Sequence, residues 1–335
     1  MSFLSVQMGK TDNVAATVHL GEVHMSLDPD AAKLLGLLAQ QNAPPMETLS
    51  PDEARTAAAA AAALSADPGA EVGSVEEREI GGVPTLVVTP IASDRIGSDP
   101  SPLLVWFHGG GWVIGSAEQS LHTARDLAAG AGCVVVVPDY RLAPEHPFPA
   151  AFDDALAVTR AVVDEARQFG GDPSRIAVGG DSAGGNLAAV AALWVPGLVH
   201  QLLAYPVIDA TMSHPSYRRV ERGYLLSASM MRWFVDCYVG DADPADPRIS
   251  PIFASEDALG RTCPAHVVTA AYDPLCDEGE AYANRLTHLG VPTVVSHYGG
   301  QMHGFLTMGA AVPTGAVALD EAIGHLRHAF AAPPT

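Results

Sequence analysis

The sequence predicts an α/β fold in which helices pack on both faces of a mostly parallel sheet. Short apolar runs rich in Val, Leu and Ile alternate with longer segments of helical periodicity along most of the chain. One such run, residues 103–107, is apolar at every position, which is typical of a strand buried on both faces. With 335 residues and 48% hydrophobic side chains, the chain can bury one large core.

The expected elements follow one another without an internal repeat. Residues 1–24 have weak periodicity, and we assign them no role; two helices are expected between residue 25 and residue 70, before the first strand. The expected strands are an antiparallel pair over 76–90, then 103–107, 133–137, 175–178, 201–205, 265–270 and 291–298. The expected helices are 120–130, 150–168, 186–194, pieces within 224–238, 278–289 and 316–330.

Charge and cysteine usage narrow the class of protein. Asp and Glu outnumber Lys and Arg by 38 to 18, so the chain lacks the basic footprint that nucleic acids and anionic membranes require. Residues 187–208 are apolar but are interrupted by Pro196-Gly197, which favours buried core over a membrane span. The four cysteines are widely spaced and residues 1–23 lack a secretory signal, so we expect reduced thiols, no disulfide or zinc site, and a cytoplasmic location.

The stretch with the clearest chemistry is residues 179–185, which read Gly-Gly-Asp-Ser-Ala-Gly-Gly between an apolar strand and an Ala-rich helix. Strand, tight turn and helix are the context that makes G-x-S-x-G a nucleophile elbow centred on Ser182. Gly180, Ala183 and Gly184 leave the room that such a turn needs. A phosphate-binding loop is the alternative, but no Lys-Ser/Thr pair follows the glycines.

A nucleophilic serine needs a base and an orienting acid, and in open α/β sheets such groups gather at the carboxyl ends of strands. Asp273 follows the expected strand 265–270, and His303 follows strand 291–298. Five other histidines lie within strands, on helices or at the start of a strand, namely His266, His288, His297, His325 and His328. Asp277 is the rival acid, but its place before helix 278–289 suits an N-cap.

The remaining requirement is a pocket for the oxyanion. His108 is followed by Gly109, Gly110 and Gly111, and bare glycine N–H groups can approach a substrate oxygen closely. We expect the N–H groups of Gly109, Gly110 and Ala183 to form this hole, with His108 orienting the loop. Trp112 is either a pocket wall or a core residue.

These motifs together resemble one family. The chain is similar to the bacterial hormone-sensitive-lipase-like carboxylesterases of the α/β-hydrolase fold. The matching segments are 108–112 (HGGGW), 139–145 (DYRLAPE), 180–185 (GDSAGG), 273–275 with 277–279 (DPL, DEG) and 303–305 (HGF). The resemblance implies an eight-stranded sheet, a triad of Ser182, Asp273 and His303, and an oxyanion hole of Gly109, Gly110 and Ala183. It also implies hydrolysis of short acyl esters without a cofactor, and we assign no metal ligand.

The resemblance also divides the chain. It implies a catalytic domain over 71–208 and 248–335, with a helical cap made of residues 25–70 and an insertion at 209–247. Residues 1–24 have no counterpart in the family pattern. Tyr224 and Leu225 of the insertion, with Trp112, are candidates for the substrate pocket, although Met and aromatic residues at such spacing are more often core. A homodimer is common among members of the family.

Two other functions stay open at this point. The same triad serves hydrolases of amides, thioesters, lactones or carbamates, and the fold does not choose between them. A small-molecule receptor on the same fold is the second alternative, because plant gibberellin receptors resemble this family but have lost the catalytic histidine. The presence of His303 argues against a receptor here.

Overall fold

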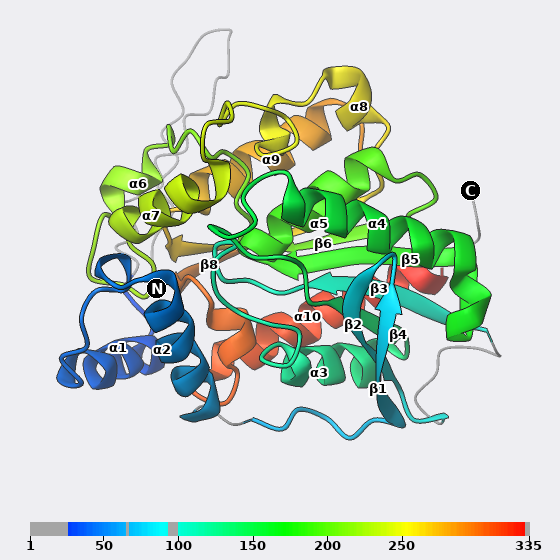
Figure 1. The fold of residues 1–335 in the computed structure, drawn as a ribbon, viewed down its shortest axis with the longest axis horizontal. Coiled ribbons are helices and arrows are strands. Elements are labelled where there is room, and N and C mark those ends of the chain that lie inside the picture. The colour runs from blue at the N-terminus through cyan, green and yellow to red at the C-terminus, as the bar shows by residue number, and fades with distance from the viewer. Residues whose placement is uncertain (1–25, 65–66, 93–99, 332–335) are drawn as a thin grey trace, which may run out of the picture.

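The computed structural model describes residues 26–64, 67–92 and 100–331, and its centre is one twisted eight-stranded sheet (Figure 1). The strands in chain order are β1 (Ser74–Ile80), β2 (Val83–Thr89), β3 (Ser101–Phe107), β4 (Val134–Pro138), β5 (Gly171–Asp181), β6 (His200–Ala204), β7 (Ala265–Tyr272) and β8 (Thr293–Met302). Their order across the sheet is β1-β2-β4-β3-β5-β6-β7-β8. β1 and β2 pair antiparallel and β2 joins β4 antiparallel, whereas every other pairing is parallel. The predicted fold class, including the number of strands, is confirmed.

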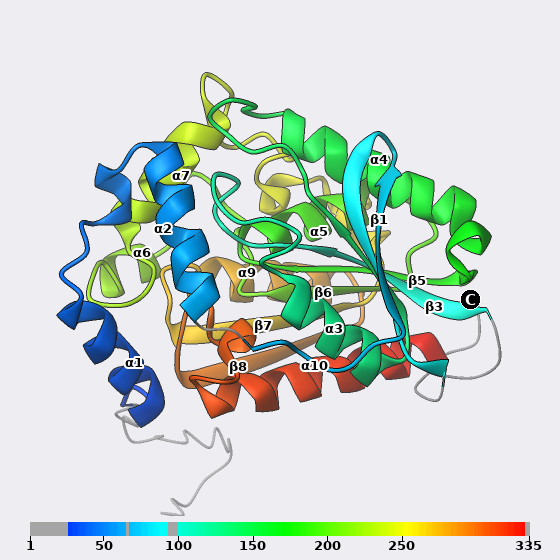
Figure 2. The ribbon, with the colours of Figure 1, turned by 60° about the horizontal axis from the view of Figure 1, so that its bottom comes forward.

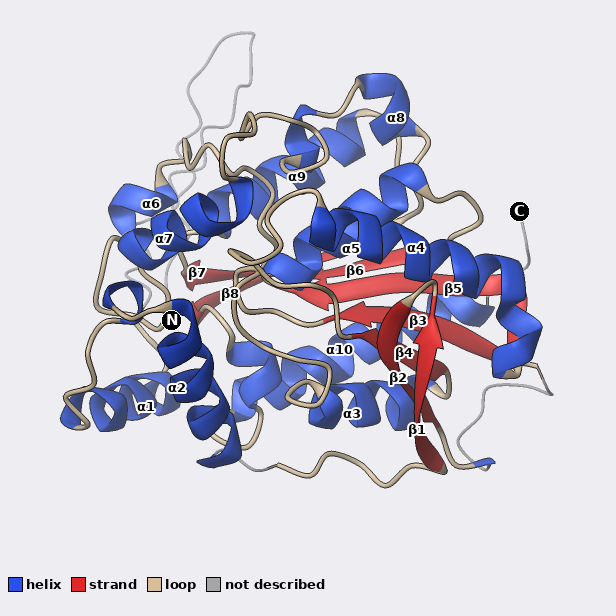
Figure 3. Cartoon of the chain, viewed as in Figure 1, coloured by secondary structure: helices blue, strands red, loops and turns tan. Residues whose placement is uncertain are grey.

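Helices cover both faces of the sheet, as Figure 3 shows by colour. The helices of three or more turns outside the N-terminal region are α3 (Leu121–Ala131), α4 (Ala150–Glu165), α5 (Ala183–Trp194), α7 (Ala228–Val239), α9 (Cys276–His288) and α10 (Pro313–Ala331). The shorter ones are α6 (Ser216–Arg219) and α8 (Glu256–Gly260), with 3-10 turns η1 (Met46–Thr48), η3 (Ala166–Phe169), η4 (Pro251–Phe253) and η5 (Phe305–Met308). Helices α4, α5 and α9 lie on one face, and α3 and α10 lie on the other (Figure 1).

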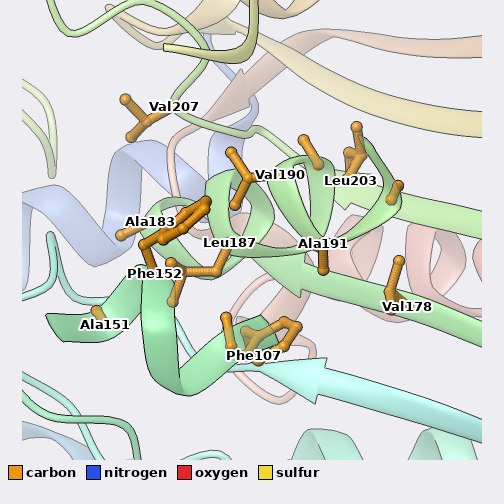
Figure 4. Packing of buried hydrophobic residues seen from close by; sticks show 14 of the residues in the cluster. Phe107, Ala151, Phe152, Val178, Ala183, Leu187, Val190, Ala191, Leu203 and Val207 are labelled. Atoms are coloured by element: carbon orange, nitrogen blue, oxygen red, sulfur yellow. The ribbon is translucent and has the colours of Figure 1, made fainter. Parts of the chain in front are cut away.

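Strand β3 explains why residues 103–107 are apolar throughout. Leu103, Val105 and Phe107 belong to the core under α4 and α5, whereas Leu104 and Trp106 belong to the core under α3 and α10. All five side chains are fully buried, since alternate residues of a strand point to opposite faces. Figure 4 shows the first of these cores around Phe107 and α5.

Some element boundaries differ from the prediction. Helix α4 ends at Glu165 and continues as the 3-10 turn η3, which ends at Phe169 because Gly170 takes a left-handed conformation. Strand β5 is longer than expected, running from Gly171 to Asp181. In the 209–247 segment the main helix begins at Ala228, where the Ser227 hydroxyl accepts a hydrogen bond from the Met230 N–H.

The two N-terminal helices are α1 (Pro29–Gln40) and α2 (Pro51–Leu64), and they lie beside the carboxyl edge of the sheet next to α6 and α7 (Figures 1 and 2). The Ser229 hydroxyl of α7 donates to Glu47 in η1 at 2.5 Å, which links the two parts directly. The stretch 1–24, to which we assign no role, lies outside the described residues. None of the described helices combines the length and apolar character needed to span a membrane.

Candidate active site

The carboxyl ends of three parallel strands bring the predicted catalytic residues together. Ser182 follows β5, Asp273 follows β7 and His303 follows β8. The three strands share one sheet, with β6 between β5 and β7, so residues 121 positions apart in sequence meet at one edge. The backbone after β5 is fixed there because the Ser182 N–H donates to the Ala204 carbonyl at 2.9 Å.

Ser182 stands on a strained turn with a left-handed φ of 58° and ψ of −119°. Non-glycine residues rarely adopt such angles, and they persist only where surrounding contacts enforce them. Here the neighbours are tight: a Cβ on Gly184 would overlap the Phe107 carbonyl, and one on Gly180 would overlap the backbone of Gly184. The turn therefore holds the serine at the start of α5 by close backbone contact, as a nucleophile elbow requires.

Hydrogen bonds connect the three side chains in series. His303 Nε2 lies 3.0 Å from Ser182 Oγ, and His303 Nδ1 lies 2.7 Å from a carboxylate oxygen of Asp273. Because a carboxylate only accepts, Nδ1 carries the proton in the neutral ring and Nε2 is free to accept the Ser182 proton. The second Asp273 oxygen accepts the Leu275 N–H at 2.9 Å, so the acid is held on both sides.

The three hydrogen-bonded side chains are largely buried, but two of them keep a small exposed surface. Asp273 is fully buried, whereas Ser182 and His303 keep 7% and 8% of their surfaces exposed. The Tyr205 ring packs beside His303, with ring centroids 4.7 Å apart, and limits how far the imidazole can turn. This arrangement leaves Ser182 and His303 slightly exposed to solvent, while Asp273 is kept from water.

In the oxyanion loop, residues 108–111, one of the predicted N–H donors differs from expectation. The Gly109 N–H donates to the Asp181 carboxylate at 3.0 Å, so the expectation that it is free for a substrate oxygen is wrong. Among the described residues, the N–H groups of Gly110, Gly111 and Ala183 donate to no partner. Gly110 and Gly111 have φ of 114° and 58°, which favour glycine, and these angles set the direction of their amides. The available donors are therefore Gly110, Gly111 and Ala183.

The segment 139–145 braces this loop. The Tyr140 hydroxyl donates to the His108 carbonyl at 2.8 Å, and its ring stacks on His108 with centroids 4.2 Å apart. His108 Nδ1 in turn lies 2.7 Å from the Gly109 carbonyl. His108 is buried and points into the loop, so it orients the backbone and not the substrate.

Asp181 is a residue whose role the sequence did not indicate. Burial raises the pKa of its carboxyl to about 6. The nearby His303 and the hydrogen bond from the Gly109 N–H act in the opposite direction and lower this pKa. Its side chain lies so close to Gly109 that a Cβ there would overlap it. Asp181 therefore connects the nucleophile elbow to the oxyanion loop through one charge-assisted hydrogen bond.

The three pocket candidates have different positions. Trp112 is fully buried and stacks on Tyr238 with centroids 4.3 Å apart, so its assignment to the pocket is wrong and it is a core residue. Leu225 lies close to the site: its side chain would be 3.3 Å from a Cβ on Gly304, the residue after His303. Tyr224 packs on Tyr272 and borders a cavity of about 210 Å³, which Ser182, Asp273 and His303 do not line.

One further residue near the site was missed in the sequence. Arg55 of α2 donates to the carbonyls of Val113 and Ala143 at 2.9 Å each, and it also pairs with Glu145. It thus fastens the N-terminal helices to the turn that follows the oxyanion loop. The signal was weak, because a lone arginine in an Ala-rich helix reads as a solvated residue.

The acids near the start of α9 also differ from expectation. Asp277 is not an N-cap: it lies inside the first turn and pairs with Arg219 at 2.6 Å. Glu278 is fully buried, and one of its oxygens accepts the N–H groups of Ile208 and Asp209 at 2.8 and 3.2 Å. Burial raises its pKa well above the usual range. Glu278 fixes the chain where the 209–247 segment leaves the sheet.

Comparison with known proteins agrees with this geometry. A family model described as alpha/beta hydrolase fold matches residues 104–307. Carboxylesterase NlhH of Mycobacterium tuberculosis is 38% identical over 269 residues, which cover 76% of this chain and 83% of the relative. An ethyl acetate hydrolase of Pseudomonas putida is 36% identical over 306 residues, covering 86% and 94%.

Solved structures extend the likeness to the backbone. A hyperthermophilic esterase from the archaeon Pyrobaculum calidifontis superposes with a TM-score of 0.83 at 36% identity, covering 91% of this chain and 99% of the other. The alpha/beta hydrolase LAE6 from a lake metagenome gives a TM-score of 0.86 at 37% identity, covering 91% and 99%. The chain therefore belongs to the hormone-sensitive-lipase-like alpha/beta hydrolases.

Proposed function

We propose that the protein is a carboxylic ester hydrolase that works through an acyl-enzyme on Ser182. The observation that carries the proposal is the unbroken series of hydrogen bonds from Ser182 through His303 to Asp273. Relatives named as carboxylesterase, ethyl acetate hydrolase and arylesterase, each between 36% and 38% identical, support the same reaction class. We assign Ser182 as nucleophile, His303 as general base and acid, and Asp273 as the residue that orients the imidazole.

In this mechanism the ester carbonyl carbon is attacked by Ser182 Oγ while His303 Nε2 takes the hydroxyl proton. The C–O bond to the alcohol then breaks, and His303 returns the proton to the leaving oxygen. Water repeats the sequence on the acyl-enzyme, with His303 again as the base, and releases the acid. Asp273 stays ionised and stabilises the imidazolium that forms in each half-reaction.

We assign the oxyanion hole to the N–H groups of Gly110, Gly111 and Ala183. Each donor of this kind contributes on the order of 3 kcal/mol to the transition state in comparable enzymes. The Ala183 N–H stands at the start of α5, where the helix dipole also favours negative charge. The fixed loop supplies this stabilisation without reorganisation during the reaction.

We further propose that residues 25–70 and 209–247 cap the site and restrict it to short or medium acyl chains. Phe234 supports this limit, because its ring lies directly against Gly111 in the oxyanion loop. Leu225 lies beside Gly304 and narrows the other side. Both side chains come from the 209–247 segment, so that segment sets the length of chain that fits above Ser182.

A series of p-nitrophenyl esters from acetate to palmitate tests both parts of the proposal. We expect faster cleavage of butyrate than of laurate, and no turnover by Ser182→Ala. Phe234→Leu should raise the ratio of laurate to butyrate turnover, whereas Trp112→Phe, at a buried position, should leave the ratio unchanged. Turnover that persists in Ser182→Ala would contradict the mechanism, and laurate cleaved faster than butyrate would contradict the chain-length limit.

Two points of assembly and location belong to the same proposal. β8 is one of the two edge strands of the sheet, and Val294 and Val295 on it are each 42% exposed, which favours a homodimer built along this edge. Size-exclusion chromatography with light scattering, with Val295→Lys as the disrupting variant, tests it; a monomeric wild type would contradict it.

The four cysteines are free thiols, which supports a cytoplasmic location.

A further inference from the structure

A group of histidines lies at the end of the sheet opposite Ser182. The catalytic groups follow the carboxyl ends of the strands, whereas these histidines lie where β6 and β7 begin and on the adjoining face of α10. They are His200 at the start of β6, His266 as the second residue of β7, and His325 and His328 on α10. None of them has a part in the proposed reaction.

One chain of hydrogen bonds in this region determines which ring nitrogen of His266 carries the proton. The Ser296 hydroxyl donates to Glu321 at 2.8 Å, and His266 Nε2 lies 2.8 Å from the same hydroxyl oxygen. Since a hydroxyl has one proton and a carboxylate only accepts, Ser296 accepts from His266 Nε2, which therefore carries the ring proton. His266 Nδ1 is then a bare lone pair, buried and without a partner among the described residues.

Three ligand-type side chains converge around this chain. His266, Glu321 and His325 each offer one nitrogen or oxygen atom, and these atoms lie within 4.8 Å of one another. Glu321 and His325 are four residues apart on α10, so they share one face of the helix. The His266 and His325 rings have centroids 4.2 Å apart. A tetrahedral zinc site needs ligand atoms about 3.4 Å apart, so binding requires these side chains to move closer together. The Glu321 carboxylate, which accepts from the Ser296 hydroxyl at 2.8 Å and the Tyr298 hydroxyl at 2.5 Å, would give up one of these bonds to the ion.

The polar groups around His266 are also incompletely satisfied. His200 Nε2 is buried without a hydrogen-bond partner in the described part of the chain, as is His266 Nδ1. Buried nitrogen atoms normally have partners, so two orphans in one place call for an explanation.

We propose that His266, Glu321 and His325 form a binding site for a Zn²⁺-like transition-metal ion, remote from the active site. Two imidazoles and one carboxylate are a donor set that zinc uses, with water in the fourth position. The ion would tie α10, near the end of the described chain, to the start of β7. Its effect is therefore on stability, because a ligand that binds only the folded state raises the midpoint of unfolding.

A second cluster, Cys276, Glu280 and His297, offers the rival location. It is the weaker candidate for two reasons. His297 Nδ1 already has two partners, Glu280 at 2.9 Å and the Thr269 hydroxyl at 3.0 Å, whereas His266 Nδ1 has none among the described residues. Burial, together with nearby carboxylates, also raises the pKa of the Cys276 thiol to about 12. A thiol must lose its proton to bind zinc. His297 therefore supplies a matched control.

The test measures Zn²⁺ binding to the untagged full chain by competition with a chromophoric chelator, and thermal unfolding with and without Zn²⁺. We expect one Zn²⁺ per chain and a higher unfolding midpoint when it is bound. His325→Ala, at a partly exposed helix position, should weaken binding by at least about tenfold and abolish the midpoint shift. Glu321→Gln should weaken binding, and His297→Ala should leave it unchanged.

Three outcomes would overturn the proposal: no binding at micromolar free Zn²⁺, equal binding by wild type and His325→Ala, or loss of binding in His297→Ala. Thermal unfolding without metal provides the folding control for every variant. A Co²⁺ complex with the visible absorption of a four-coordinate site, absent in His325→Ala, would support the donor set independently.

Discussion

Two glycine-rich turns carry the proposed active site, and they use glycine for different reasons. In the elbow at 179–185, Gly180 and Gly184 provide room for backbones that touch, while the unusual dihedral falls on Ser182. In the loop at 108–111, Gly110 and Gly111 themselves adopt left-handed angles. In the elbow, glycine is therefore needed for close packing, and the strained backbone angles fall on Ser182. In the loop, glycine is needed because the backbone angles that direct the amides are ones that other residues rarely adopt.

The largest expected effect comes from adding a side chain to the elbow. In Gly184→Ala the added Cβ would overlap the backbone carbonyl oxygens of Phe107 and His108. These backbone atoms are held in place and cannot move aside. We expect loss of esterase turnover together with a lower unfolding midpoint. Gly324→Ala, on α10 with open space around it, is the matched control and should stabilise by about 0.5–1 kcal/mol. A Gly184→Ala protein as active as wild type would refute the packing account of the elbow.

The next effect concerns the carboxyl that joins the two turns. Burial raises the pKa of Asp181 to about 6, so the folded protein holds this proton more tightly than the unfolded chain does. The stabilisation from the protonated form is complete below about pH 4 and is lost as the pH rises through 6. Asp181→Asn removes this dependence, so its stability relative to wild type should rise by at most about 3 kcal/mol from pH 4 to pH 7.

Chemical unfolding of both proteins at the two pH values measures this difference. Any cost of placing an amide in the site is the same at both pH values and cancels in the comparison. A difference between variant and wild type that does not change with pH would mean that Asp181 is already ionised across the range.

A smaller effect is expected when the link between the turns is cut. Asp181→Ala removes the acceptor of the Gly109 N–H, so the loop can shift relative to Ser182. A displacement of the loop amides by about 1 Å would lower turnover about 10- to 100-fold. Because the oxyanion amides act in the transition state, kcat should fall with little change in KM. Asp181→Asn retains an acceptor and should keep most of the activity; equal losses in both variants would argue against a positioning role.

The smallest effect concerns the outer support of the loop. Arg55→Ala removes the bonds to Val113, Ala143 and Glu145, at a cost of about 1 kcal/mol because Glu145 is half exposed. Arg55 lowers the pKa of Glu145 to about 2, so this stabilisation is present above pH 4.5 and fades as the pH falls toward 2. Arg222→Ala, which breaks an exposed pair with Glu221, should change the unfolding free energy by nearly nothing.

The same comparison explains what could be predicted from the sequence. The strands and the elbow follow from local patterns: apolar runs, a Gly-x-Ser-x-Gly spacing and the helix after it. The oxyanion loop holds three identical glycines, and only the position of the Asp181 carboxylate, seventy-two residues away, decides which amide is occupied. Trp112 was likewise ambiguous, because its stacking partner Tyr238 comes from a distant helix.

Labelling with a fluorophosphonate tests the central claim most directly, since the reagent bonds to a serine only when that hydroxyl is activated. Intact-mass and peptide analysis should find one adduct per chain, on Ser182, with none in Ser182→Ala and labelling slowed about 10⁴-fold or more in His303→Asn. An unlabelled wild type, or an adduct that persists in Ser182→Ala, would contradict the assignment of Ser182 as the nucleophile.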